Sequence, residues 1–412
     1  MNHIEKLIDE LCPHGVEFKK LGEFATLDRG NGMPKTMLVD SGVGAIHYGQ
    51  IYTHYGVSAD KTLSFVTNDD ASRLTKVHPG DVIITNTSEN LEDVATTVVW
   101  LGDDDIVIGG HSSVIRHDQD ARFLAYWFRS AAFEKQKYRL ATGAKVIDIS
   151  AKKLESVVVP VPPLEVQREI VKVLDLFTEL EAELEAELEA RRKQYEHYRD
   201  QLLTFPEDGE TPWVKLRNLA TVMSGNAFPK AYQNRSSGDF AFYKVSDMNL
   251  SGNSTFMGRA NNYVNEEDVF TLGASLVPGM SIIFPKVGAA VATNKKRMTV
   301  EECLVDNNVM AVTPGQELNA RFLHHWFETI DLRDIAHQHV ALPSIRKTAV
   351  LKMQMPLPPL SEQKRIADIL DTFDALVNDL ESGLPAEIEA RRKQYEYYRD
   401  KLLTFKQLEP SA

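Results

Sequence analysis

The chain has 412 residues, of which 43% are hydrophobic, and its formal net charge is −13. This length exceeds that of one ordinary domain, and the two cysteines, Cys12 and Cys303, are too few for a disulfide framework and suit a reducing, cytoplasmic compartment. Apolar runs are too short for a membrane span, and the charged start MNHIEKLIDEL does not resemble a signal peptide, so we expect no membrane association.

The first 161 residues predict an α+β segment. A short helix is expected within residues 1–15, strands at 45–51, 82–84 and 157–160, and an amphipathic helix at 121–128. Polar groups of the kinds that contact base edges in DNA lie near predicted strand ends and loops. Each of them alone is more typical of a satisfied loop or core residue. These candidates are Tyr48, Gln50, Thr87, Ser88, Asn90 and His111.

A long helix is predicted over residues 165–205, because apolar residues recur there at steps of three and four. Its middle holds the tandem tetrapeptide EAELEAEL at residues 181–188. Such an apolar stripe requires a partner helix. The residues that we expect to form this packing surface in the first helix are Leu180, Leu184, Leu188, Tyr195 and Tyr198.

Residues 207–357 repeat the plan of the first segment. Strands are predicted at 240–247, 282–283 and 353–356, and an amphipathic helix at 320–327. Residues 206–357 carry 15 Lys and Arg against 15 Asp and Glu, so this part of the acidic chain is neutral. Its most basic stretch runs over 286–297 and includes Lys286, Lys295, Lys296 and Arg297. Cations in this pattern suit phosphate or guanine contacts, although a solvated hairpin tip has the same composition.

The end of the chain repeats the long helix. The sequence ARRKQYEHYRDQLLTF at 190–205 returns as ARRKQYEYYRDKLLTF at 390–405, with fourteen of sixteen positions identical. A repeat of this fidelity indicates two similar halves in tandem. Ser382, Gly383 and Pro385 interrupt the second copy, where we predict a break or kink. The two helical segments are expected to pair antiparallel, with Tyr395 and Tyr398 on the packing surface of the second.

Familiar catalytic signatures are missing. The sequence contains no Asn/Asp-Pro-Pro-Tyr/Phe tetrapeptide of adenine-N6 methylation and no Walker A loop. Neither cysteine has metal-ligand spacing. The histidines His324, His325, His337 and His339 suggest a metal site only weakly, because the first half has Ala125 and Tyr126 at the positions of the first pair. We therefore expect no metal and no catalytic residues.

The two halves together resemble the specificity subunit of type I restriction-modification enzymes. The resemblance covers the whole chain and rests on the two Pro-Pro-Leu…Gln…Ile/Val-Leu-Asp…Phe openings and the two Arg-Arg-Lys-Gln-Tyr closings. The tetrapeptide at 181–188 is similar to the Thr-Ala-Glu-Leu repeats of the type IC group, with Glu181 and Glu185 in place of Thr. Residues 244–247, including Lys244 and Ser246, and residues 288–297 are similar to segments common in target recognition domains.

The resemblance implies an α+β fold with a pseudo-twofold tandem repeat. Two target recognition domains, at 1–161 and 207–357, are then joined by helical regions at 162–206 and 358–412 that pair as an intramolecular antiparallel coiled coil. Each domain reads half of a bipartite double-stranded DNA site, and the helices set the spacer and dock two modification subunits. By this resemblance the chain binds no cofactor, S-adenosylmethionine belongs to the modification subunits, and ATP and Mg belong to the restriction subunits.

Three other readings remain open. The chain is alternatively an orphan subunit of a methylation-only system, which the absence of a neighbouring restriction gene would favour. A self-contained methyltransferase of unrecognised type would methylate DNA with S-adenosylmethionine and no other subunit. A purely structural coiled-coil scaffold is the third reading, and the unequal loops of the two halves argue against it.

Overall fold

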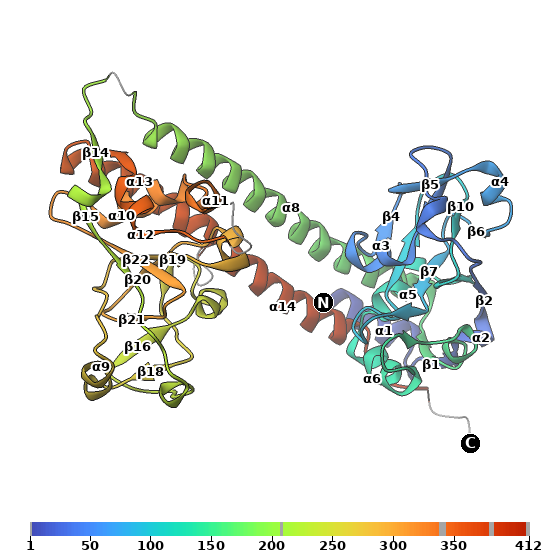
Figure 1. Ribbon diagram of the computed structural model, residues 1–412. Helices are drawn as coiled ribbons and strands as arrows, with labels where there is room; N and C mark the ends of the chain where they lie inside the picture. Colours follow the sequence, from blue (N-terminus) through green and yellow to red (C-terminus); the bar gives the residue numbers. More distant parts are fainter. Residues whose placement is uncertain (1, 207–208, 338–342, 379–382, 409–412) are drawn as a thin grey trace. The chain divides into compact units, whose positions relative to one another are not determined.

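The computed structural model describes residues 2–206, 209–337, 343–378 and 383–408 (Figure 1). The chain divides into two compact units. The first unit comprises Met1–Ala182 and Ala390–Ala412, and the second comprises Glu183–Glu389. The division between them on the long helix falls inside the tetrapeptide repeat, between residues 182 and 183.

The first unit is built on a five-stranded sheet of order β2-β11-β7-β9-β4, in which only the edge pair β4 and β9 is parallel. A four-stranded mixed sheet, β5-β3-β10-β6, and the pairs β1-β13 and β12-β8 complete it. Strand β7 is buried at all four residues, as expected for a short continuous apolar run. The elements of the first unit are α1 (Asn2–Leu11), β1 (Glu17–Lys20), α2 (Leu21–Phe24), β2 (Ala25–Arg29), η1 (Lys35–Met37), β3 (Val43–Ile46), α3 (Tyr48–Thr53), β4 (Ser58–Ala59), β5 (Ser64–Val66), α4 (Asn68–Ala71), β6 (Thr75–Val77), β7 (Val82–Thr85), β8 (Thr87–Ser88), β9 (Thr97–Trp100), β10 (Ile106–Ile108), β11 (Ser112–His117), α5 (Ala121–Trp127), α6 (Ala131–Leu140), β12 (Ile147–Asp148), α7 (Ala151–Leu154), β13 (Val158–Val161), and the start of α8 (Leu164–Leu203).

The second unit repeats this topology. Its five-stranded sheet has the order β15-β22-β19-β20-β17, again with a parallel edge pair, β17 and β20. A three-stranded mixed sheet, β18-β16-β21, and the pair β14-β23 stand where the first unit has its smaller sheets. The elements of this unit are β14 (Trp213–Lys215), η2 (Leu216–Asn218), β15 (Ala220–Ser224), η3 (Lys230–Tyr232), β16 (Phe240–Tyr243), η4 (Val245–Asn249), β17 (Phe256–Met257), β18 (Tyr263–Val264), α9 (Glu266–Leu272), β19 (Ile282–Pro285), η5 (Gly288–Thr293), β20 (Arg297–Thr299), β21 (Leu304–Val305), β22 (Val309–Pro314), α10 (Ala320–Glu328), α11 (Leu332–Ile335), α12 (Lys347–Lys352), β23 (Gln354–Pro356), α13 (Leu360–Asn378) and the start of α14 (Leu384–Leu402).

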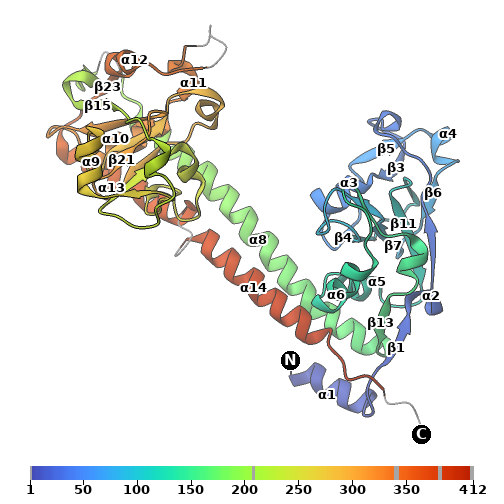
Figure 2. The same cartoon turned by 60° about the horizontal axis from the view of Figure 1, so that its bottom comes forward.

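The long helices pair antiparallel, as predicted. In the first unit, Phe177 of α8 stacks on Tyr398 of α14 with ring centroids 5.6 Å apart, and one turn later Glu181 pairs with Arg392 at 2.5 Å. Residue numbers therefore rise along one helix as they fall along the other, and both views show these two stretches side by side (Figures 1 and 2). In the second unit, Tyr198 of α8 stacks on Phe373 of α13 at 5.4 Å.

Each copy of the repeated sequence completes the core of a different unit. Leu402 and Leu403, from the second copy, lie in the core of the first unit. The residues after this copy lie beside Val16, near the start of the chain. Val16 N–H donates to the Lys406 carbonyl and Leu408 N–H donates to the Val16 carbonyl, both at 2.8 Å. The first copy contributes Leu203 to the core of the second unit.

Most predicted elements are confirmed. Helix α8 spans Leu164–Leu203 against a prediction of 165–205, and α5, α10, β13 and β23 lie where expected. The predicted interruption is also present, because α13 ends at Asn378 and α14 begins at Leu384 with Pro385 in its first turn. Ser382, which was part of that prediction, and His339 lie outside the described residues.

Two strand predictions are too long. The strand expected at 45–51 ends at Ile46, and helix α3 begins at Tyr48. His47 caps this helix, because its N–H donates to the Gln50 side chain at 3.0 Å. The strand expected at 240–247 likewise ends at Tyr243, where Lys244 N–H donates to the Asp247 side chain at 2.7 Å. The same local cap therefore ends the equivalent strand in both units.

Candidate nucleic-acid interface

Three of the candidate polar residues of the first unit meet at one place. Helix α3 starts at Tyr48, whose ring centroid lies 4.7 Å from that of His111 in the exposed turn between β10 and β11. The His111 Nδ1 atom is 2.6 Å from the Thr87 hydroxyl in β8. Two short elements and a turn thus bring together an aromatic ring, an imidazole and a hydroxyl. We call Tyr48, Thr87 and His111 the first-unit cluster.

The other three candidates are held in local structure. The Gln50 amide accepts from His47 N–H and donates to the Ser64 hydroxyl at 2.7 Å, so both of its polar atoms are used. Ser88 is only 4% exposed. Asn90 is exposed, but its amide donates to the Asp93 carboxylate at 2.7 Å. These side chains shape the loops around the first-unit cluster more than they offer free groups.

Two residues beside this cluster, the titratable His47 and the cationic Lys35, were not predicted from the sequence. Burial lowers the pKa of His47, and the nearby charges of Lys35 and His111 lower it further. Lys35 is exposed at the start of η1. A repeated motif in the sequence could have identified Lys35. The motif is Gly-Asn-Gly-Met-Pro-Lys at 30–35 and Gly-Asn-Ala-Phe-Pro-Lys at 225–230, and the second copy ends in the exposed Lys230.

Lys286 of the second unit occupies the position that Asn86 has in the first. Lys286 N–H donates to the Asn308 carbonyl and its carbonyl accepts from Ile345, each at 2.8 Å. Asn86 makes the same two bonds, at 2.8 Å, with the His111 carbonyl and with Ile149 N–H. The turn that presents His111 in the first unit therefore presents Asn308 in the second. The framework is shared, and the side chains that it presents differ.

Lys244 corresponds to His47, since both precede the capped turn that follows the strand. Its Nζ donates to Gln233 Oε1 at 2.6 Å and lies 5.2 Å from the centroid of the Phe228 ring. Ser246, two residues later, is exposed. We call Lys244, Ser246 and Lys286 the second-unit cluster, because they lie on the segments that correspond to those of the first-unit cluster.

The predicted phosphate contacts of Lys296 and Arg297 require correction. Lys296 is 1% exposed and its Nζ lies 3.9 Å from a Glu328 carboxylate oxygen, with no hydrogen-bond partner among the described residues. The Arg297 Nε atom donates to the Asn253 carbonyl at 2.6 Å, and Lys295 pairs with the Asn249 side chain. The stretch is not a solvated tip, because Arg297 opens the interior strand β20 of the five-stranded sheet. Burial consequently lowers the pKa of Lys296.

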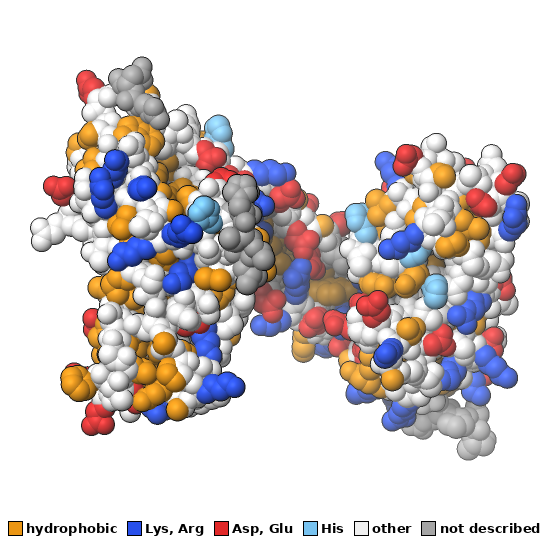
Figure 3. Space-filling model, viewed as in Figure 1, with side chains coloured by type: hydrophobic (Ala, Val, Ile, Leu, Met, Phe, Trp, Pro, Cys, Tyr) orange, Lys and Arg blue, Asp and Glu red, His pale blue; other side chains and the backbone are white. Residues whose placement is uncertain are grey.

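Exposed cations nevertheless gather elsewhere on the second unit. Figure 3 shows Lys and Arg side chains over the region of β15, β22 and α12. Helix α12 follows Arg346 and itself carries Lys347 and Lys352. A locally positive surface attracts polyanions even on a chain of negative net charge.

The polar residues of the packed helices also differ between units. In the first unit, Asp175 of α8 accepts from the Tyr126 hydroxyl at 2.7 Å and pairs with Arg122 at 2.5 Å. In the second, Asp371 of α13 contacts His325 at 2.7 Å. His325 is buried, and its side chain makes this contact inside the second unit. In the described part of the chain, no three His, Cys, Asp or Glu residues gather as a metal site.

The packing residues predicted for the helices are placed as follows. Leu184 and Tyr195 are buried, with Tyr195 in the core of the second unit, and Leu188 packs against that core. Tyr395 packs against the core of the first unit. Tyr198 is 37% exposed despite its stacking, and Leu180 is half-buried. Within the described residues, no helix is long and apolar enough to span a membrane.

Comparison with known proteins decides the family. The family model described as type I restriction modification DNA specificity domain matches residues 13–190 and again 210–390. The chain belongs to this specificity-domain family. Two matches in tandem agree with the repeat and with the duplicated topology, and they confirm the resemblance to type I specificity subunits with two target recognition domains.

Relatives of this family match from about two thirds of the chain to almost all of it. The Type I restriction enzyme EcoR124I/EcoR124II specificity subunit of Escherichia coli is 29% identical and covers 98% of this chain and 97% of its own length. A putative type I restriction enzyme specificity subunit of Haemophilus influenzae is 32% identical over 69% of this chain and 72% of its own.

Solved structures from type I restriction-modification systems share the fold. The S subunit of a type I restriction-modification system from M. genitalium has a TM-score of 0.54 at 14% identity, over 94% of this chain and 96% of that chain. A chain from a study of complex assembly and conformational transition of the type I R-M system has a TM-score of 0.61 at 16% identity, over 94% and 97%.

Proposed function

We propose that each unit of this specificity subunit reads one half of a bipartite double-stranded DNA site. The observation that carries the proposal is the shared framework with exchanged side chains. The turn after β3 or β16, the strand end after β7 or β19 and the turn before β11 or β22 recur in both units. Their equivalent positions hold His47, Asn86 and His111 in one unit, next to Tyr48 and Thr87, and Lys244, Lys286 and Asn308 in the other. Different donors and acceptors on one scaffold suit two different half-sites.

The remaining parts of the complex follow from this role. The chain acts as a non-catalytic subunit in the cytoplasm, and its paired helices set the spacer and dock two modification subunits that methylate adenine N6. S-adenosylmethionine is bound by those subunits, and restriction subunits add ATP- and Mg-dependent cleavage. Membership of the specificity-domain family supports this division of labour.

The test is single-molecule methylome sequencing of a host that expresses the chain with its neighbouring modification gene, compared with a host that expresses the modification gene alone. N6-methyladenine at one split motif, present only with this chain, is the expected result. Identical methylation in both hosts would overturn the proposal. Methylation by the purified chain and S-adenosylmethionine alone would instead indicate a self-contained methyltransferase.

The assignment of the two clusters is tested by matched variants. His111→Ala should relax or abolish recognition in one half of the motif, and Lys286→Ala should do so in the other half only, because each side chain serves its own unit. A well-formed base contact contributes about 1–3 kcal/mol of discrimination. Loss of both half-sites from either variant would contradict the assignment.

A further inference from the structure

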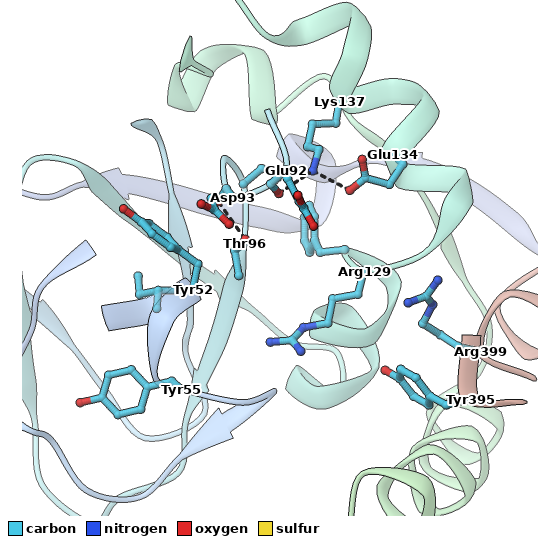
Figure 4. A pocket seen from close by; sticks show the side chains of 13 residues that line it. Tyr52, Tyr55, Glu92, Asp93, Thr96, Arg129, Glu134, Lys137, Tyr395 and Arg399 are labelled. Atoms are coloured by element: carbon cyan, nitrogen blue, oxygen red, sulfur yellow. Dashed lines mark hydrogen bonds and ion pairs between the residues drawn. The ribbon is translucent and has the colours of Figure 1, made fainter. Parts of the chain in front are cut away.

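The first unit contains an open pocket of about 320 Å³ that the proposed DNA contacts do not use. Its walls come from α3, the loop at 92–96, the junction of α5 and α6, and helix α14. Figure 4 shows Arg129 extending into the space between Tyr55 on one side and Tyr395 and Arg399 on the other. The pocket therefore joins the recognition fold to the second copy of the repeated helix.

Arg129 is a half-buried cation that has no carboxylate partner among the described residues. Its Nη2 atom donates to the carbonyls of Gly56, at 2.7 Å, and Thr97, at 3.2 Å. Its Nε atom is buried and has no hydrogen-bond partner among the described residues, and the ion pairs of the described part of the chain do not include this guanidinium. Burial lowers the Arg129 pKa. A partly buried guanidinium with an unpaired, buried Nε–H is costly unless a further group completes its interactions.

The other cations of the pocket already have carboxylate partners. Lys137 pairs with Glu134 at 2.5 Å and also donates to the Glu92 carbonyl at 3.1 Å. Arg399 pairs with Asp400 at 3.0 Å. Among the cations that line the pocket, it is therefore Arg129 that lacks a carboxylate partner within the described residues.

The second unit supplies a carboxylate of its own at this position. The alignment of α5 with α10 places Glu328 where the first unit has Arg129, and the repeated helix places Arg199 where the first unit has Arg399. A Glu328 carboxylate oxygen lies 3.9 Å from Lys296. Burial raises the Glu328 pKa, and the cations Lys296, Arg297 and Arg199 oppose that rise. At this position the second unit thus carries an anion, Glu328, and the first unit carries a cation, Arg129.

We propose that the pocket receives a carboxylate side chain from a partner protein, with Arg129 as its anchor, and that this partner is a modification subunit. The identity of the partner rests on the proposed function. A guanidinium that presents Nε to a carboxylate forms a charge-assisted contact of well-defined geometry.

The rim of the pocket selects against nucleic acid as the occupant. Glu92, Asp93 and Glu134 line it. Glu134 is paired with Lys137, and the Glu92 and Asp93 carboxylates repel the continuous negative charge of a duplex backbone. A protein segment in which one acidic residue is flanked by Lys or Arg complements both the anchor and the rim. The same segment has no equivalent place in the second unit, where Glu328 replaces the anchor.

The test uses the full chain and the modification subunit encoded beside it. Binding is measured for the wild type, for Arg129→Gln, and for Arg139→Gln, a control that removes an exposed cation of the same unit on α6. Loss of one charge-assisted contact predicts roughly ten- to hundred-fold weaker binding for Arg129→Gln, and no comparable change for the control. Equal affinities for all three chains would overturn the inference.

A second measurement does not depend on how the variant folds. Hydrogen exchange of the wild-type chain should slow at residues 128–137 and 392–402 when the modification subunit binds. Unchanged exchange there in a formed complex would overturn the inference, as would weaker duplex DNA binding by Arg129→Gln with unchanged subunit binding. Failure of the wild type to bind the modification subunit at all would overturn the proposed partner and, with it, the proposed function.

Discussion

The two copies of Leu-Leu-Thr-Phe allow a matched test of which part of the chain completes which unit. Leu403 is 2% exposed in the core of the first unit, and Leu203 is 6% exposed in the core of the second. Leu403→Ala removes a nearly fully buried side chain and leaves a cavity, which costs about 2–5 kcal/mol. For a unit of this size that corresponds to a fall in Tm of roughly 5–15 °C.

Hydrogen exchange followed by mass spectrometry locates the loss. Leu403→Ala should speed exchange in β11, at Ser112–His117, nearly 300 residues away in sequence, and leave β22, at Val309–Pro314, protected. Leu203→Ala should have the reverse effect. Faster exchange of β22 in Leu403→Ala, with β11 unchanged, would refute the assignment of the C-terminal segment to the first unit.

Three further predictions concern the long helix and the buried charges. Deletion of residues 185–188 shortens α8 by about 6 Å, against about 3.4 Å per base pair, so methylome sequencing should show a spacer shorter by one or two base pairs and unchanged half-sites. Burial, followed by the Arg321 cation, holds the pKa of His324 well below its ordinary value of 6.5. Because the unfolded chain then binds the proton more readily, the second unit should lose stability as the pH falls through 6.5. The variant His324→Ala places alanine where the first unit has Ala125. It should weaken this pH dependence of the free energy of unfolding, measured in urea at pH 7.5 and 5.5. Lys296→Met should destabilise the second unit by roughly 1–3 kcal/mol in the same urea unfolding, because it removes the cation 3.9 Å from the Glu328 carboxylate, and DNA affinity should stay within twofold.

The sequence could predict which polar residues belong to the candidate site, but not which of them lie together. Tyr48, Thr87 and His111 were recognised as polar groups near strand ends, and the structure brings them together because β8, α3 and the turn before β11 converge. The prediction for the basic run at 295–297 is wrong for the opposite reason. Local composition does not reveal that Arg297 begins an interior strand, so the sequence predicts a surface position for Lys296, whose side chain is buried.

The sequence by itself determined the duplication, the long helix and the need of its apolar stripe for a partner helix. These features depend on local periodicity and on the near identity of residues 190–205 and 390–405, both of which are readable along the chain. Only the tertiary structure decided that the second copy completes the first unit, through Leu402, Leu403 and the backbone bonds to Val16. The same holds for the Arg129 guanidinium, whose Nε atom has no hydrogen-bond partner among the described residues. Burial and partners at long sequence separation arise from packing, and no local pattern encodes them.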